Sequence, residues 1–143
     1  MTLEDKKLLI QDVMARLPYN TKFDLNGIRG SIHQVNIYTL YKGNDINNYI
    51  CSVDFFGDGN PIDIEHFKPC LLPLSSMTEE QYESLNKSNC AHSVEYSVKN
   101  GFKCIYFKTY SLELIDWLNA NHFDYRGLIE KGLAIDATNL NVY

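Results

Sequence analysis

Apolar residues recur with helical spacing at the start of the chain. Between Thr2 and Leu17, most apolar positions fall close to one face of a helical projection, and most charged or amide positions fall elsewhere. Thr2 can accept a hydrogen bond from the free amides of the first turn, and Pro18 ends the pattern because it has no N–H. A helix is therefore predicted over Thr2–Leu17. Its apolar positions are Leu3, Ile10, Val13, Met14 and Leu17, and its outward polar positions are Glu4, Lys7, Gln11 and Asp12.

The pattern then changes to alternation, which is typical of strands. Strands are predicted at Lys22–Leu25, Ser31–Tyr41 and Tyr49–Phe56, because these stretches are rich in β-branched and aromatic residues. Turn-forming residues separate them, starting with the pair Asn26-Gly27. Three antiparallel strands in a row predict a meander or a small barrel-like sheet.

Extended and helical segments are expected to follow. Pro69 and Pro73 favour an extended segment at an edge of the core. Ser76 and Glu79 have the spacing of a capping box, which predicts a short helix over Thr78–Lys87. Cys90–Asn100 permits two interpretations. The favoured one is a hairpin with Phe102–Tyr110, because Val94, Tyr96 and Val98 alternate, and the rival is a helix over Ala91–Lys99.

The stretch Leu114–Ala137 is expected to organise the C-terminal half of the core. Ser111 can cap a helix over Leu112–Asn121, whose broad apolar side includes Trp117, the only tryptophan. No linker or repeat interrupts the chain, so residues 1–143 are predicted to form one globular domain. The predicted fold class is α+β, with a small antiparallel sheet packed against N-terminal, middle and C-terminal helices.

Composition narrows the possible functions. Among 143 residues, 45% are hydrophobic and 22% are charged, which is ordinary for a globular protein. The net charge of −5 argues against binding to duplex nucleic acid, which usually requires a basic face. The interrupted apolar positions near Met1 do not resemble a signal peptide, and no apolar run could span a membrane. A cytoplasmic location with reduced cysteines is expected, and the oligomeric state is left open.

Three stretches together carry a resemblance. They are MARLPYNTKF at Met14–Phe23, FKPCLLPLSSMTEEQ at Phe67–Gln81, and WLNANHFDYRGLIEKGLAIDA at Trp117–Ala137. They resemble small uncharacterised proteins encoded by prophages and mobile elements of gut Bacteroides-type bacteria. The resemblance implies a phage-like accessory origin in a bacterial cytosol, and it implies no catalytic residue and no cofactor.

Histidines and cysteines permit one metal hypothesis. His66, Cys70, Cys90 and His92 could form a four-ligand zinc set, since zinc favours thiolate and imidazole ligands. The spacings differ from the paired cysteines of most structural zinc sites, so buried thiols and surface imidazoles are the favoured interpretation. No cofactor is therefore predicted.

Catalytic constellations are equally weak. A cysteine could be combined with His122 and Asp124, but nothing in the sequence shows that a base lies near a thiol. A non-enzymatic protein is therefore favoured, with an enzyme built from dispersed residues as the least favoured alternative.

One loop is the candidate binding site. His122, Phe123, Asp124, Tyr125 and Arg126 combine aromatic groups with an arginine, a set that is enriched at protein interfaces. The loop is expected to be partly exposed beside Gly57–Asn60 or Pro69–Pro73, with Arg126 pairing with Asp58, Asp63 or an acid of another molecule. The favoured interpretation is nevertheless structural, with Phe123 and Tyr125 packed onto the sheet and Arg126 bonded to nearby carbonyls. The favoured partner is another protein, and single-stranded bases stacked on the tyrosines of the sheet are the alternative.

Overall fold

The computed structural model describes residues 1–32, 34–42, 45–54, 62–87, 94–99, 102–108 and 110–143. Helices and strands both contribute to the fold, which is α+β with a mostly antiparallel, open arrangement of strands. The α-helices are α1 (Leu3–Arg16), α2 (Glu79–Lys87) and α3 (Leu112–Ala120), and the 3-10 helices are η1 (Leu17–Tyr19), η2 (Ile64–His66) and η3 (Leu74–Ser76). The strands are β1 (Lys22–Leu25), β2 (Ile28–Ser31), β3 (Gln34–Lys42), β4 (Asp45–Asp54), β5 (Ile62–Asp63), β6 (Phe67–Pro73), β7 (Val94–Lys99), β8 (Phe102–Phe107), β9 (Phe123–Asp124) and β10 (Ile135–Asp136).

Strand β6 is the central strand of the larger sheet. It pairs antiparallel with β1, and it pairs parallel with both β10 and β9. β1 also pairs with β2. Each partner of β6 covers only two or three of its residues, so the ladder is short and interrupted, which accommodates Pro69 and Pro73. The segment predicted for an edge of the core is therefore the central strand.

The predicted run of three strands is divided between two sheets. β1 and β2 form a tight hairpin at Asn26-Gly27, where both residues have positive φ, at 52° and 90°. Asp24 stabilises this turn by accepting the Gly27 N–H at 2.9 Å. The following strands, β3 and β4, leave this sheet and form an antiparallel meander with β5. A meander is therefore present, but β1 belongs to the other sheet and the third strand of the meander is β5.

Three adjoining clusters of buried side chains form the core. The first joins α1 to β1, η2 and β6 through residues such as Leu9, Val13 and Phe23. The second joins α2, α3 and β9 through Leu85, Leu118 and Phe123. The third comprises Leu71, Leu128, Leu133 and Ala134, beside β6. Trp117, predicted as core, is only partly buried at the rim of the second cluster, and its ring stacks on Phe123 with centroids 5.8 Å apart.

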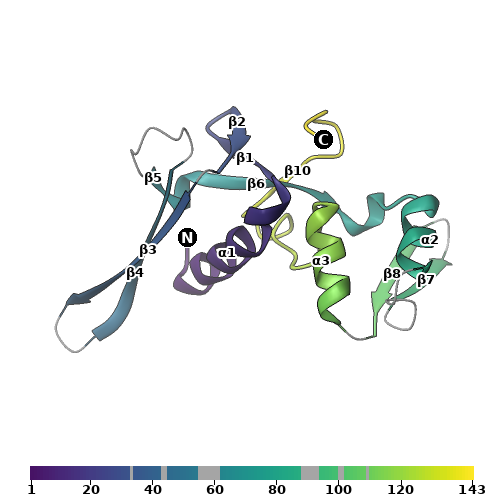
Figure 1. Ribbon diagram of the computed structural model, residues 1–143, viewed down its shortest axis with the longest axis horizontal. Helices are drawn as coiled ribbons and strands as arrows, with labels where there is room; N and C mark the ends of the chain where they lie inside the picture. Colours follow the sequence, from purple (N-terminus) through teal and green to yellow (C-terminus); the bar gives the residue numbers. More distant parts are fainter. Residues whose placement is uncertain (33, 43–44, 55–61, 88–93, 100–101, 109) are drawn as a thin grey trace.

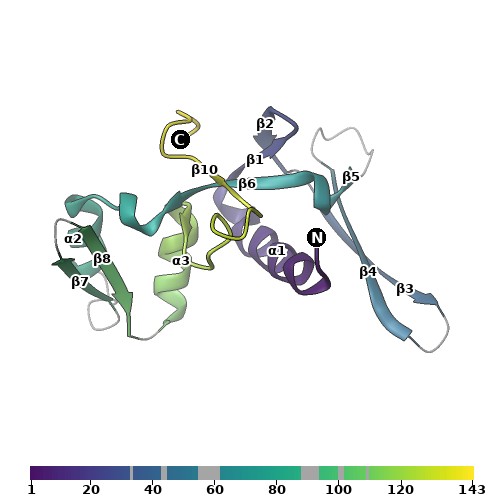
Figure 2. The ribbon, with the colours of Figure 1, turned by 180° about the vertical axis from the view of Figure 1, so that it is seen from behind.

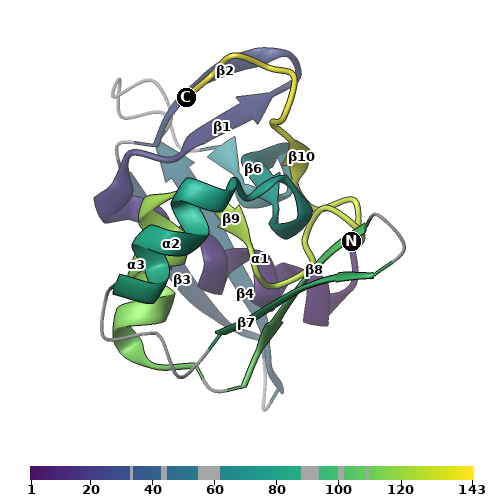
Figure 3. The same ribbon diagram turned by 90° about the vertical axis from the view of Figure 1, so that its right-hand side faces the viewer.

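The molecule is elongated, with a hairpin at each end (Figure 1). β6 runs along the long axis, and α1 and α3 lie beneath it. At one end β3 and β4, here called the arm, extend away from the body, and the view from behind shows the same extension (Figure 2). At the other end β7 and β8 lie with α2, nearest the viewer in Figure 3.

The hairpin interpretation of the middle region is confirmed where the structure describes it. β7 and β8 pair antiparallel from Val94↔Phe107 to Lys99↔Phe102. The rival helix over Ala91–Lys99 is therefore wrong for residues 94–99. The predicted turn residues Asn100 and Gly101, and the start of the segment at residues 90–93, lie outside the described part of the chain.

Helix caps follow the sequence signals with one shift. The Thr2 side chain accepts the Asp5 N–H at 3.1 Å, and the Ser111 side chain accepts the Leu114 N–H at 3.2 Å, as predicted. The capping box of α2 is formed by Thr78 and Gln81 and not by Ser76 and Glu79. Gln81 Oε1 accepts the Thr78 N–H at 2.9 Å, and Thr78 Oγ1 accepts the Gln81 N–H at 3.2 Å. The Ser76 hydroxyl does not cap the helix, because it donates to the Pro73 carbonyl.

Candidate functional site

The candidate loop, His122–Gly127, lies beside β6. Leu72 pairs with Phe123 and Pro73 pairs with Asp124, and the Leu72 N–H donates to the His122 carbonyl at 2.9 Å. The predicted position beside Pro69–Pro73 is confirmed, whereas Gly57–Asn60 lies outside the described residues. Exposure is uneven along the loop. Phe123 and Asp124 are buried, and His122, Tyr125, Arg126 and Gly127 are partly exposed.

The loop begins where α3 ends. The Trp117 carbonyl accepts both the backbone N–H and the side-chain amide of Asn121, at 3.0 and 2.9 Å, which closes the last turn of the helix. His122 then adopts a φ of +60°, a left-handed conformation that few residues with a large side chain adopt. This reversal turns Phe123 and Asp124 toward β6.

Asp124 fixes the second half of the loop. Its carboxylate oxygens accept the N–H groups of Leu128 at 3.0 Å and Ile129 at 2.8 Å. Gly127 lies between Asp124 and Leu128 with a φ of +71°, a conformation that glycine adopts without strain. With both oxygens bonded to backbone amides, Asp124 acts as a turn-forming residue.

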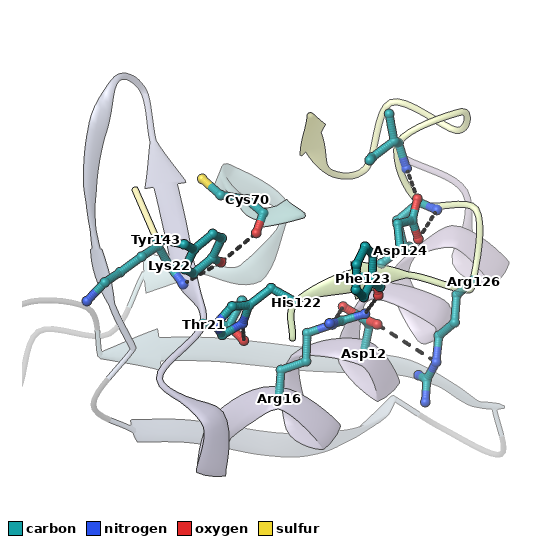
Figure 4. Close-up of polar contacts among 12 residues, drawn as sticks. Asp12, Arg16, Thr21, Lys22, Cys70, His122, Phe123, Asp124, Arg126 and Tyr143 are labelled. Carbon is teal, nitrogen blue, oxygen red and sulfur yellow. Dashed lines mark hydrogen bonds and ion pairs between the residues drawn. The ribbon is translucent and has the colours of Figure 1, made fainter. Parts of the chain in front are cut away.

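A buried ion pair on α1 holds the loop from below (Figure 4). Arg16 and Asp12 are both 0% exposed, and Arg16 Nε donates to Asp12 Oδ2 at 2.7 Å. Arg16 Nη2 donates to the Phe123 carbonyl at 2.8 Å and so joins α1 to β9. Burial raises the pKa of Asp12, and the neighbouring Arg16 opposes that effect. The sequence pattern placed Asp12 among the outward polar residues, which is wrong because the arginine compensates its charge inside the core.

Arg126 adds a second cation to the same carboxylate. Its Nε lies 3.8 Å from Asp12 Oδ1. The predicted acidic partner of Arg126 is thus in the same chain, but it is Asp12 and not Asp63, which pairs with Lys6 at 3.4 Å. Asp58 lies outside the described residues. The guanidinium carbons of Arg16 and Arg126 lie 5.5 and 5.1 Å from the centre of the Tyr125 ring, close enough for cation–π contacts.

His122 faces the opposite side of the loop, toward β1 and Tyr143 (Figure 4). Its Nδ1 lies 3.1 Å from Thr21 Oγ1, and its ring stacks on Tyr143 with centroids 3.9 Å apart. The Tyr143 hydroxyl donates to the Cys70 carbonyl at 2.6 Å and accepts the Lys22 N–H at 3.0 Å. Burial, with Arg16 and Lys22 nearby, lowers the pKa of His122 to about 4. The imidazole is therefore neutral at physiological pH.

The structure does not assemble the hypothetical cysteine site from its described residues. His122 contacts Thr21, while the Asp124 carboxylate accepts backbone N–H groups at the other end of the loop. Burial raises the pKa of the Cys70 thiol, which opposes formation of a nucleophilic thiolate.

The structure describes only two of the four residues of the zinc hypothesis, His66 and Cys70. His66 is exposed at the end of η2, whereas Cys70 is buried in β6. Cys90 and His92 lie outside the described residues. Among the residues that the structure does describe, no three histidines, cysteines or acids lie together as a metal site would require.

Two hollows near this region are small. One, of about 130 Å³, lies between η1 and the β1–β2 hairpin and is lined in part by Thr21 and Ser31. The other, of about 250 Å³, lies between η3 and the loop and is lined in part by Asp124 and Glu130. Small-molecule sites commonly enclose roughly 300–1,000 Å³.

The arm differs from the loop because one edge of β3 has backbone groups with no strand partner among the described residues. β3 is the edge strand of its sheet, and β4 is its only strand partner among the described residues. Alternate backbone N–H and C=O groups of such a strand point away from its partner. Alternation in the sequence predicts both strands but not the edge position of β3, because alternation does not specify strand order.

Comparisons of the chain with protein-family models, curated proteins and solved structures give no match. The described helices include none that has both the length and the apolar character to cross a membrane.

Proposed function

We propose that the protein is a non-enzymatic protein-binding module whose binding element is the edge of β3. The observation that carries the proposal is a nine-residue edge strand on an arm that extends away from the body (Figure 1). The proposal includes the phage-like accessory origin that the sequence resemblance implies.

Backbone chemistry explains why an edge of this kind binds protein. An extended peptide can add as a further strand, because its own N–H and C=O groups match the unpaired groups of β3. Nine residues at about 3.4 Å per residue span roughly 30 Å. This length exceeds the usual five or six residues of a strand, so it offers a long continuous ladder.

The sequence of β3 does little to prevent such pairing. Edge strands are commonly protected by charged residues, proline or bulges. Between Gln34 and Tyr41 the strand has no charged residue and no proline, and Lys42 stands at its end. The register shift between Leu40 and Lys42 lies at the same far end, which leaves a regular ladder from Gln34 to Leu40.

The geometry of the loop favours a structural role there. Its polar groups contact the same chain, with Asp124 on Leu128 and Ile129, Arg126 on Asp12, and His122 on Thr21. Binding by His122, Phe123, Asp124, Tyr125 and Arg126 would require some of these contacts to open.

Capture from a bacterial lysate with mass spectrometry, with and without nuclease, tests this proposal. Leu40→Lys places a charge on β3, and Asn48→Lys places the same charge on β4 at the register position opposite. We expect Leu40→Lys to lose the captured protein, Asn48→Lys and Arg126→Ala to keep it, and nuclease to have no effect. Loss with Arg126→Ala alone would assign binding to the loop, and loss with nuclease would favour the nucleic-acid alternative.

A further inference from the structure

We propose that the partner of the β3 edge is the β3 edge of a second copy of this chain, so that two arms join in one four-stranded sheet. The inference rests on the proposed binding role of the edge and names its occupant. The two β3 strands run antiparallel about a twofold axis at Tyr38, the middle residue of Gln34–Lys42. The resulting strand order is β4, β3, β3 and β4.

The register of this pairing is self-complementary. Position 38 lies opposite position 38 of the other copy, and Ile37 lies opposite Thr39, within the part of β3 that precedes the register shift. These are β-branched and aromatic residue types, which form favourable cross-strand pairs. The twofold axis is compatible with either set of outward backbone groups, because directly opposed residues form either a hydrogen-bonded or a non-hydrogen-bonded pair.

Charge favours a second copy at β3. Lys42 is the only charged residue of the strand, and it lies at one end, beyond the register shift after Leu40. The two lysines therefore stand at opposite ends of the paired strands. No like charges face each other along the ladder.

The other edge of the arm is partly occupied. β5 pairs with β4 at Ser52 and Val53 and so prevents continuous antiparallel pairing of β4 with a second copy. Of the two strands of the arm, only β3 has an outer edge without a strand partner among the described residues.

The molecular shape is compatible with this arrangement. The arm extends away from the body in both views, so two arms can approach while the helices stay apart (Figures 1 and 2). Strand pairing along one edge buries less surface than a standard interface of about 800 Å² per partner. We therefore expect an equilibrium between monomer and dimer that depends on concentration.

Sedimentation velocity of the full chain over a concentration series tests the inference. The unsubstituted protein is expected to move from monomer to dimer as its concentration rises. Tyr38→Lys and Tyr38→Glu each place like charges on the twofold axis, so each variant alone is expected to stay monomeric. Mixing the two variants in equal amounts is expected to restore the dimer, because lysine then faces glutamate at that position.

Asn48→Lys is the matched control, since it adds a charge to the arm on β4, and it is expected to dimerise like the unsubstituted protein. Three results would overturn the inference: an unsubstituted protein that is monomeric at every concentration, a mixture that stays monomeric, or a control that loses the dimer. If the protein is monomeric and Leu40→Lys still abolishes capture of another protein, self-pairing is wrong and the proposed function survives. If neither the dimer nor the capture depends on β3, both are wrong.

Discussion

The loop beside β6 and the arm use their polar groups in opposite ways. In the loop, a carbonyl, one carboxylate, an arginine and a histidine contact other groups of the same chain within 3.8 Å. In the arm, one edge of β3 has no strand partner among the described residues. A polar group that is satisfied internally stabilises the fold, whereas an unpaired backbone edge is available to another chain. The aromatic, arginine-containing loop resembles an interface by composition, yet its contacts belong to the core.

Removal of the buried Arg16 side chain should give the largest loss of stability, if the contacts of the loop belong to the core. Arg16→Met should lower the free energy of unfolding by about 3–5 kcal/mol, because it leaves the buried Asp12 carboxylate with only the distant Arg126. It also removes the donor to the Phe123 carbonyl. Urea denaturation measures the loss. Asp12→Leu combined with Arg16→Met should recover part of it, and a loss below about 1 kcal/mol for the single variant would show that the pair does not support the loop.

A substitution of Trp117 measures how much its packing on Phe123 contributes to stability. Trp117→Ala should cost about 2–3 kcal/mol, less than the roughly 3–5 kcal/mol of a fully buried tryptophan, because the ring is only partly buried against Phe123. Thermal and urea unfolding check the value. Leu112→Ala on the same helix is the control, since Leu112 is 71% exposed, and it should change stability by less than about 0.5 kcal/mol. Equal losses in both variants would contradict the assigned packing.

Acid should weaken the loop through His122. The pKa of His122 is lowered to about 4 in the folded protein, while the unfolded chain has the ordinary value near 6.5. The unfolded state therefore binds the proton first, so the stabilisation is present above pH 6.5 and is lost as the pH falls toward 4. We expect a loss of about 1–2 kcal/mol over this window, smaller than the full shift implies because the ring is partly exposed.

His122→Asn is the matched variant for this experiment, because asparagine also tolerates positive φ but does not titrate. Urea denaturation at pH 7, 6 and 5 should show a shallower dependence on pH for the variant than for the unsubstituted protein. Identical pH profiles would remove His122 as the cause.

Arg126 separates a structural loop from a binding loop. Arg126→Ala should lower the free energy of unfolding by about 0.5–1 kcal/mol, since its 3.8 Å contact with Asp12 is long and Arg126 is 22% exposed. Lys131→Ala removes a 3.9 Å pair with Asp5 in which both side chains are more exposed, and it should have almost no effect. If Arg126→Ala leaves the free energy of unfolding unchanged but abolishes capture of a partner protein, the loop is a binding site.

The arm should give the smallest change in stability. Leu40→Lys alters a strand with free backbone groups on one side, so the free energy of unfolding of the monomer should change by less than about 0.5 kcal/mol. Measurements at low protein concentration avoid any contribution from association. A loss above about 2 kcal/mol would show that position 40 supports the body, and the contrast between arm and loop would no longer hold.

Local signals in the sequence determined the elements whose physics is local. The helix capped by Thr2, the turn at Asn26-Gly27, the strand pair of β7 and β8, and the helix capped by Ser111 follow from hydrogen bonds and alternation within a few residues. The capping box of α2 is also local, but it begins at Thr78 and not at the predicted Ser76. The Ser76 hydroxyl donates to the Pro73 carbonyl instead.

The tertiary structure alone decided which segments meet. β6 became central because two segments far downstream, β9 and β10, pair with it in parallel, and no local pattern predicts such partners. Asp12 could be buried only because Arg16, one turn along α1, and Arg126, from the loop, supply opposite charge in the folded chain. Strand order likewise placed β3 at an edge, since alternation specifies the faces of a strand and leaves its neighbours to long-range packing.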